Sequence, residues 1–480
     1  MISAYVGKRL FKVYVDHPCI DRVAKLWKFV DRIEELYCWY GNLTILSFLA
    51  SLGSASNLKV FRLRDGLQGL TGWQPRNLPN LFQGCLPSLR ELSLATPTTW
   101  QIGLFKNLRS FELGVNPDRP ISPTHVLDAL RESPSLESFR LAGRCELPDE
   151  EPPAIALPSL RDCTLIGNGA ISLIWYMDIP ASTNVSLSTP PPTRDATEVY
   201  PFRDLCLAPC LHVLDDVSTV SFFIGFDAIK FRTQNKFGGV LNIQVYYHEN
   251  VLAGLMAFTI LLNNPFYESP CRIQTTREFA LHIERGVSRD DAEALFYVVM
   301  ISKFISGIPS LEQVELRGVP AKALSCFLRL FHKNPQVTIP FPNLQRLCLE
   351  STPLHSPKSL IADLDDLLKG REGFGLPLQF VDATINCEAL IPMAEHSTFL
   401  TAWERLVGED VRITYSRDRV EKLPRRGLRM VFFEGEGEDD EDGEDVGAVE
   451  STSGSDLDWE SWTSGKWPKA ASEMKGLTGR

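Results

Sequence analysis

The sequence lacks the features that mark membrane, secreted and metal-binding proteins. Its longest apolar run, residues 251–262, is shorter than the stretch of about 20 residues that crosses a bilayer. The N-terminus carries charged residues at positions 8, 9 and 12 and no continuous apolar stretch, which argues against a signal peptide. The 11 cysteines are scattered singly, without CxxC or Cys/His zinc spacing. We therefore expect buried reduced thiols, no metal, no membrane contact and a cytoplasmic or nuclear location.

A basic face is also missing. The net charge is −11, but residues 434–480 hold 14 acidic and 4 basic residues, so the rest of the chain has a net charge of −1. Nucleic-acid binding needs a concentration of positive charge that this neutral body does not supply. We therefore expect no nucleic-acid partner.

Catalytic motifs are absent as well. The sequence contains no GxSxG, no HExxH, no P-loop and no GxGxxG after a predicted strand. His248 with Glu249, and His282 with Glu284, are the nearest approach to acid/base pairs, and alternating positions at the edges of strands explain both pairs better. We expect a protein that is not an enzyme and carries no cofactor.

A repeated motif is the strongest feature present. The string LPSLR occurs at 86–90 and at 157–161, and SPSLE, IPSLE and FPNLQ are close variants. Each string opens the spacing LxxLxL. The apolar triples are Leu58/Phe61/Leu63, Leu89/Leu92/Leu94, Leu108/Phe111/Leu113, Leu136/Phe139/Leu141, Leu160/Cys163/Leu165, Leu311/Val314/Leu316 and Leu344/Leu347/Leu349, with weaker candidates at Ile33/Leu36/Cys38, Val217/Val220/Phe222 and Val240/Ile243/Val245.

This spacing predicts a leucine-rich-repeat solenoid over residues 1–433. The last two apolar residues of each unit are two apart, as in a short strand with one buried face. Ser122-Pro123 and Ser356-Pro357 each resemble the start of a helix between strands, and the second helix is expected to end at Gly370. Stacked units of this kind give an α/β fold with a curved parallel sheet and helices on its convex face. A doubly wound α/β domain is the rival, and such sheets need no recurring PSLxxLxL.

Two segments depart from the repeats. Residues 188–203 form a Pro-rich loop, and residues 434–480 form an acidic tail that we expect to be disordered. Solubilisation is the simpler role for such a tail. A sharper hypothesis makes Trp459, Trp462 and Trp467 the anchors of a binding motif, with Ser455 as a phosphate acceptor.

The side chains that flank the apolar strand positions are expected to line the concave face. There they form a ladder of mixed charge that suits a protein partner, although each residue taken alone is better explained as a solvated position. The predicted binding residues are Arg62, Arg64, Glu91, Ser93, Ser110, Glu112, Ser138, Arg140, Asp162, Thr164, Gln313, Glu315, Arg317, Arg346 and Glu350.

The order of these motifs resembles the F-box/leucine-rich-repeat proteins of mushroom-forming fungi. The resemblance rests on the LPSLRELSL-type strands, on the LPSLRDCTLIGNG unit at 157–169 and on the helix-then-strand passage at 359–415. It implies the substrate-recognition part of a cullin-type ubiquitin ligase. In that family an N-terminal F-box binds a Skp-type adaptor, and the repeats hold the substrate protein.

The resemblance does not extend to the F-box. We find no Leu-Pro opening followed by amphipathic helices before the repeats, and residues 22–36 are better interpreted as a crossover into the Ile33/Leu36/Cys38 strand. A ligase-independent scaffold, or a decoy that lacks the F-box, is therefore the alternative function.

Overall fold

The computed structural model describes most of the repeat region. The residues that it describes are 10–15, 24–39, 43–64, 78–95, 99–114, 121–143, 145, 153–189, 211–246, 274–284, 301, 304–305, 308–332, 341–351, 358–385, 407, 410–415 and 429–432. The chain divides into two units, residues 1–435 and 436–480. The predicted acidic tail, with Trp459, Trp462 and Trp467, and most of the Pro-rich loop lie outside the described residues.

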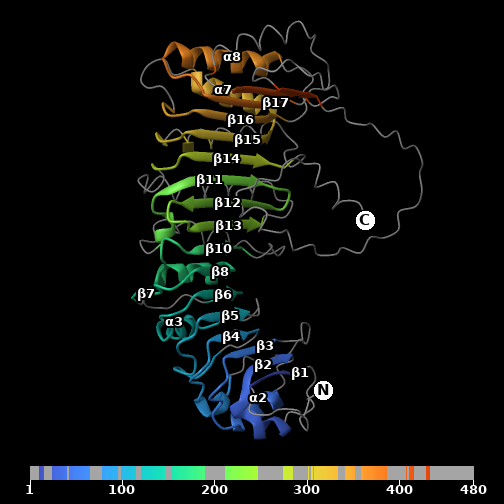
Figure 1. Ribbon diagram of the computed structural model, residues 1–480, viewed down its shortest axis with the longest axis vertical. Helices are drawn as coiled ribbons and strands as arrows, with labels where there is room; N and C mark the ends of the chain where they lie inside the picture. The colour runs from blue at the N-terminus through green and yellow to red at the C-terminus, as the bar shows by residue number, and fades with distance from the viewer. Residues whose placement is uncertain are drawn as a thin grey trace, which may run out of the picture. The chain divides into compact units, whose positions relative to one another are not determined.

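Seventeen strands of the first unit form one sheet (Figure 1). From one edge to the other they are β1 (Phe11–Val15), β2 (Ile33–Trp39), β3 (Val60–Arg64), β4 (Glu91–Leu94), β5 (Ser110–Gly114), β6 (Ser138–Ala142), β8 (Asp162–Ile166), β10 (Asn184–Ser188), β13 (Val240–Tyr246), β12 (Ala228–Asn235), β11 (Val217–Ile224), β14 (Glu278–Ile283), β15 (Gln313–Val319), β16 (Arg346–Ser351), β17 (Phe380–Ile385), β18 (Asp410–Tyr415) and β19 (Arg429–Phe432).

The sheet is parallel except at β12. Strand β12 runs antiparallel to β11 and to β13, and this three-stranded meander is inserted so that β13 pairs with β10 while β11 pairs with β14. The expectation of a wholly parallel sheet is therefore wrong at this point. Asn235 fixes the turn between β12 and β13, because its side-chain oxygen accepts hydrogen bonds from the backbone N–H groups of Phe237 and Gly239 at 3.0 and 2.9 Å.

The connections between strands carry the helical elements. They are η1 (Ala24–Arg32), α2 (Leu43–Ser51), η2 (Leu81–Gly84), α3 (Pro123–Arg131), α4 (Asn168–Ser172), η3 (Leu173–Tyr176), η5 (His212–Leu214), α7 (Ala321–His332) and α8 (Lys358–Gly373). Strands β7 (Ile155–Ala156) and β9 (Met177–Asp178) form a separate two-stranded parallel sheet within the connections. Among the described residues, no helix is long and apolar enough to cross a membrane.

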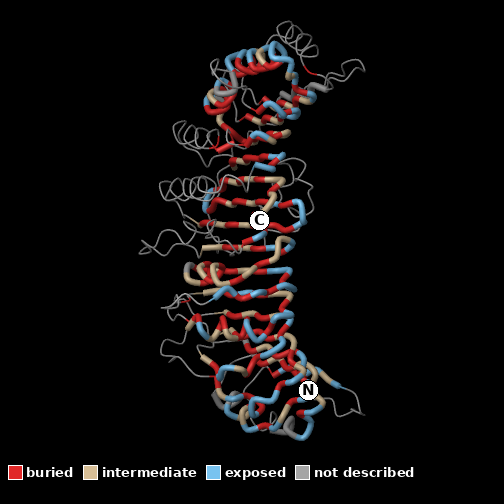
Figure 2. The backbone as a smooth tube through the Cα atoms, turned by 90° about the vertical axis from the view of Figure 1, so that its left-hand side faces the viewer, coloured by how far each residue is buried: buried red, intermediate tan, exposed pale blue. Residues whose placement is uncertain are grey.

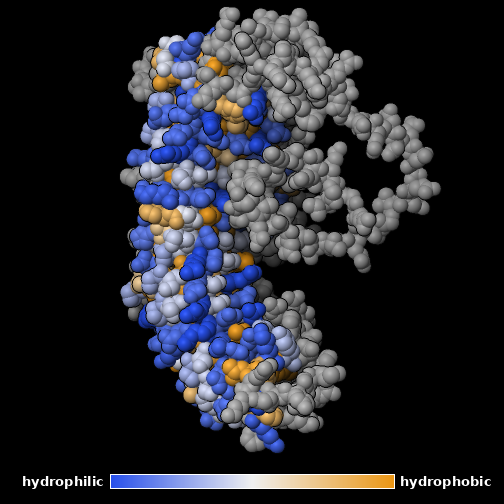
Figure 3. Space-filling model, in the orientation of Figure 1, coloured by the Kyte–Doolittle hydropathy of each residue, from blue (hydrophilic) through white to orange (hydrophobic). Residues whose placement is uncertain are grey.

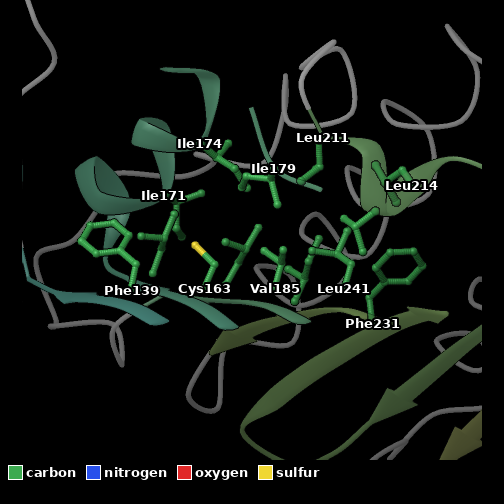
Figure 4. Close-up of a cluster of buried hydrophobic side chains, with 14 of the residues drawn as sticks. Phe139, Cys163, Ile171, Ile174, Ile179, Val185, Leu211, Leu214, Phe231 and Leu241 are labelled. Carbon is green, nitrogen blue, oxygen red and sulfur yellow. The ribbon is translucent and has the colours of Figure 1, made fainter. Parts of the chain in front are cut away.

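One face of the large sheet is buried against these connections. Buried and accessible residues alternate along the strands (Figure 2). In Figure 4, Cys163 and Val185 point from the sheet toward Ile171 and Ile174 of the connecting segments, and all four side chains are buried. The apolar residues of the LxxLxL units thus form one continuous core with the crossovers, and burial of this apolar surface is the main force that holds the stack together.

All seven strong repeat units coincide with strands, and so do the three weaker candidates. The helix predicted after Ser122-Pro123 is confirmed as α3, which starts with Pro123 in its first turn. The helix predicted to end at Gly370 continues as α8 to Gly373, so that boundary was wrong. Buried Arg371 explains the extension, because its guanidinium donates hydrogen bonds to the backbone carbonyls of Phe341 and Leu344, which hold the last turn against the approach to β16.

Candidate protein-binding face

The second face of the sheet carries the side chains that alternate with the core residues. We call it the open face and define it by Arg62, Ser93, Glu112 and Arg140, with their register partners on the other strands. Because the strands are paired in register, equivalent side chains of neighbouring strands lie side by side.

An aromatic and cationic stack occupies the first three strands of the open face. The rings of Tyr14 and Tyr37 stack with centroids 4.7 Å apart and planes 10° from parallel. The guanidinium of Arg62 lies 5.6 Å from the Tyr37 ring centroid, a cation–π distance. Tyr37 is thereby held between a ring on one neighbouring strand and a cation on the other.

Glu35 fixes this stack from the side. Its carboxylate accepts a hydrogen bond from the Tyr37 hydroxyl at 2.9 Å and pairs with the Lys12 ammonium at 2.7 Å. The Lys12 hydrogen bond, followed by that of Tyr37, lowers the pKa of the Glu35 carboxyl against its partial desolvation. Glu35 therefore stays ionised at neutral pH. The residues predicted from the sequence do not include Lys12, Tyr14, Glu35 or Tyr37, although Glu35 and Tyr37 flank Leu36 of the weaker Ile33/Leu36/Cys38 unit.

The polar ladder continues over β3 to β6. Arg62 pairs with Glu91 at 3.3 Å, and Ser93 donates a hydrogen bond to the Glu112 carboxylate at 2.9 Å. Glu112 in turn lies 3.6 Å from the Arg140 guanidinium. The predicted binding residues of this part are therefore brought together by contacts between adjacent strands.

A second group of predicted residues lies beside this ladder. Ser110, Ser138 and Asp162 are register neighbours on β5, β6 and β8, and Thr164 of β8 is the neighbour of Arg140. Asp162 accepts a hydrogen bond from the side-chain amide of Asn184 on β10 at 3.2 Å. These residues extend the open face toward the inserted meander.

Five strands that contribute no predicted binding residue separate the two parts of the predicted site. They are β10, β13, β12, β11 and β14, and their open-face residues include Arg232 and Lys230 of β12. Both side chains are partly buried, and this desolvation lowers the pKa of Lys230 and of Arg232. Lys230 lies 5.5 Å from the Phe223 ring centroid, and that ring makes an edge contact with His282 at 5.1 Å. His282 is therefore placed as an aromatic contact of the open face.

The C-terminal part of the open face is charged and aromatic. Gln313, Glu315 and Arg317 project from β15, and Arg346 and Glu350 lie on β16. Arg317 pairs with Glu315 of the same strand, and that carboxylate is buried. The guanidinium groups of Arg346 and Arg412 both approach the Phe380 ring, at 6.0 and 5.4 Å from its centroid. Of the residues predicted for this face, only Arg64 has a side chain outside the described set.

The arrangement offers hydrogen bonds, ion pairs and aromatic contacts. Within the described part of the chain, no group of three or more His, Cys, Asp or Glu side chains is placed to hold a metal ion. The buried thiols of Cys38 and Cys163 face the core, where burial raises the pKa of each to about 12 and leaves both as neutral thiols. The side chains of the open face thus present ion pairs, hydrogen bonds and aromatic contacts between neighbouring strands.

Comparison with family models, with curated proteins and with solved structures finds no match to this chain.

Proposed function

We propose that this chain is a protein-binding repeat module and that its partner lies on the open face. In this proposal the sheet is the curved, concave side of a leucine-rich-repeat solenoid, and the crossovers cover its convex side. The coincidence of the LxxLxL units with consecutive parallel strands supports this assignment.

One observation carries the proposal: open-face side chains on six successive strands are linked by contacts between neighbours. Tyr14, Tyr37 and Arg62 stack across β1, β2 and β3, and Arg62 pairs with Glu91 of β4. Ser93, two residues after Glu91 on the same strand, donates a hydrogen bond to Glu112 of β5. Glu112 then pairs with Arg140. Side chains that are already held in place lose little conformational entropy on binding, and Tyr and Arg are enriched among the residues that dominate protein interfaces.

The resemblance to F-box/leucine-rich-repeat proteins makes the function more specific. We propose that the module is the substrate-recognition part of a cullin-type ubiquitin ligase adaptor, with a substrate protein on the open face. The alternative is a ligase-independent scaffold or decoy, which would use the same face without a Skp-type adaptor.

A pull-down of the 480-residue chain from cell lysate, probed for the Skp-type adaptor and the cullin, tests the ligase assignment. Recovery of both proteins is the expected result. Recovery of other proteins that depend on the open face, without adaptor or cullin, would contradict the ligase assignment and leave the scaffold. If no recovered protein depends on open-face residues, the binding-module proposal itself fails.

A further inference from the structure

Strand β1 forms an edge of the large sheet. Among the described residues it pairs with β2 alone, through a parallel register that includes Val13 with Leu36 and Val15 with Cys38. The other side of such a strand presents backbone N–H and C=O groups that can pair with another strand. Native sheets commonly protect an edge with a covering segment, a bulge or a charge. Strand β1 carries one charge, that of Lys12, which is paired with Glu35, and its register with β2 shifts between Phe11 and Lys12.

Apolar side chains are exposed around this edge. Leu10 is 41% exposed, Tyr14 is 59% exposed and Phe29 is 42% exposed. They are three of the seven large apolar residues that are exposed among the described residues, although β1 and η1 are a small part of the chain. Figure 3 shows hydrophobic side chains gathered at this end of the first unit. A cluster of exposed apolar side chains at one place marks an interaction surface more often than the same residues scattered singly.

The exposed side chains are held in position. Phe29 packs edge-on against Phe11 of β1 with centroids 6.4 Å apart, and the Arg32 guanidinium lies 5.7 and 5.9 Å from the two ring centroids. Tyr14 stacks on Tyr37 through one ring face and remains mostly exposed. The edge is therefore a rigid surface, which reduces the entropy lost when a partner docks.

We propose that β1 pairs antiparallel with β1 of a second copy of this chain, about a two-fold axis that passes through Val13. The strand sequence Phe-Lys-Val-Tyr-Val is complementary to itself in this register. Val13 lies opposite Val13 of the second copy, Phe11 lies opposite Val15, and Lys12 lies opposite Tyr14. A two-fold axis requires this kind of self-complementary patch.

In that pairing, the side chains on both faces of β1 lie opposite side chains with which they can make favourable contacts. Phe11, Val13 and Val15 lie on the core side and meet only apolar residues. Lys12 and Tyr14 lie on the open face, where each ammonium meets a tyrosine ring, so no like charges stand directly opposite each other. Glu35 beside Lys12 further reduces repulsion between the two copies.

A cross-link tests the register. In an antiparallel pair, residues that are directly opposite have Cα atoms about 4.5 or 5.5 Å apart, and both distances lie within the range of a disulfide. In a chain whose exposed Cys85 is replaced by Ser, Val13→Cys is expected to give a covalent dimer under mild oxidation. Val15→Cys in the same background is the matched control. In the proposed register Val15 lies opposite Phe11 of the second copy, so the two Val15 residues are about 13 Å apart along the strands and their cysteines are not expected to cross-link.

Sedimentation of the full chain across the micromolar range tests the dimer without a covalent bond. The unaltered chain is expected to dimerise. Tyr14→Lys sets the new lysine against Lys12 of the second copy and is expected to shift the chain to monomer. Phe226→Lys also replaces an exposed aromatic residue with lysine, at a position 55% exposed between β11 and β12, and is expected to leave the dimer intact. Circular dichroism checks that both variants are folded.

Three outcomes would overturn the inference: a chain that stays monomeric throughout that range, a dimer that Tyr14→Lys and Phe226→Lys affect equally, or equal cross-linking of Val13→Cys and Val15→Cys. The cross-link comparison remains decisive if Tyr14→Lys fails to fold.

Discussion

The carboxylate of Glu112 lies 3.6 Å from the guanidinium of Arg140, on neighbouring strands β5 and β6 at the end of the polar ladder that starts at Arg62. Both side chains are about half exposed, so water and salt screen their attraction. Exchanging the two charges, as Glu112→Arg with Arg140→Glu, keeps an ion pair at the same place while it inverts the pattern that a partner meets.

We expect this exchange to change the free energy of unfolding by less than about 1 kcal/mol. Ser93 loses its hydrogen bond to Glu112, which contributes a small part of that cost. Urea denaturation followed by circular dichroism measures the change. A much larger loss of stability would mean that the open face is structural and would count against its role in binding.

The buried cysteines give a prediction on reactivity and pH. Cys85 is exposed, whereas burial raises the pKa of Cys38 and Cys163 to about 12. At pH 8 iodoacetamide is therefore expected to label Cys85 in the folded chain and to leave Cys38 and Cys163 unlabelled until denaturant is added. Mass spectrometry of the tryptic peptides reports each site, and rapid labelling of Cys163 in the folded state would contradict its place in the core.

The same two thiols make the stability of the fold depend on pH. An unfolded cysteine ionises near its ordinary pKa of 9.0, while the folded thiols keep their protons until about pH 12. Their contribution to stability is complete below pH 9 and is lost as the pH rises through that window, because the unfolded state then releases protons. Replacing both residues with Ala should flatten this part of the pH profile relative to the unaltered chain.

Gly318 is a position where glycine is required. Its φ is +64°, and a Cβ atom there would lie 2.0 Å from the backbone oxygen of Ile283 on β14. Gly318→Ala is expected to lower the free energy of unfolding by about 1–3 kcal/mol. Gly53→Ala is the control, since a Cβ at Gly53 meets nothing within 4 Å. Thermal denaturation of the two variants should separate them clearly, and equal melting temperatures would show that the β14–β15 contact is looser than described.

The inserted meander should be part of the same cooperative core. Phe231 of β12 is fully buried, and its ring lies 4.8 Å from that of Phe222 on β11. Phe231→Ala is expected to cost about 3–5 kcal/mol of unfolding free energy, while Phe226→Ala at the exposed turn costs little. If Phe231→Ala unfolded the meander alone, hydrogen exchange would lose protection in 217–246 and leave 110–166 unchanged.

The sequence predicts those strands that carry an LxxLxL unit, because that pattern is local, whereas β1, β10, β14, β17, β18 and β19 were not among the predicted units. A Pro-Ser-Leu turn followed by two apolar residues at period two fixes both the strand and its buried face, as at Leu89/Leu92/Leu94. Strand β12 was missed because it has no such turn before it, and its antiparallel direction follows from the tight turns at 225–227 and 236–239. The antiparallel direction of β12 also depends on its pairing with β11 on one side and β13 on the other.

The sequence was sufficient to predict which side chains face away from the core. It predicted only part of the residues that make up the open face. Alternation alone places Arg62, Glu112 and Arg140 opposite the core. Alternation does not fix which residues touch, because the register between strands depends on how each crossover packs. The Tyr14–Tyr37 stack and the contact of Lys230 with Phe223 therefore required the structure.

The most direct test of the open-face assignment compares two charge exchanges by quantitative pull-down and mass spectrometry. One variant carries Glu112→Arg with Arg140→Glu. The other carries Asp128→Arg with Arg131→Asp, which inverts an ion pair of 2.7 Å on α3, away from the open face. We predict that proteins captured by the unaltered chain are retained by the α3 variant and lost by the open-face variant. Loss of the same proteins from both variants, or from neither, would contradict the assignment of the open face as the binding surface.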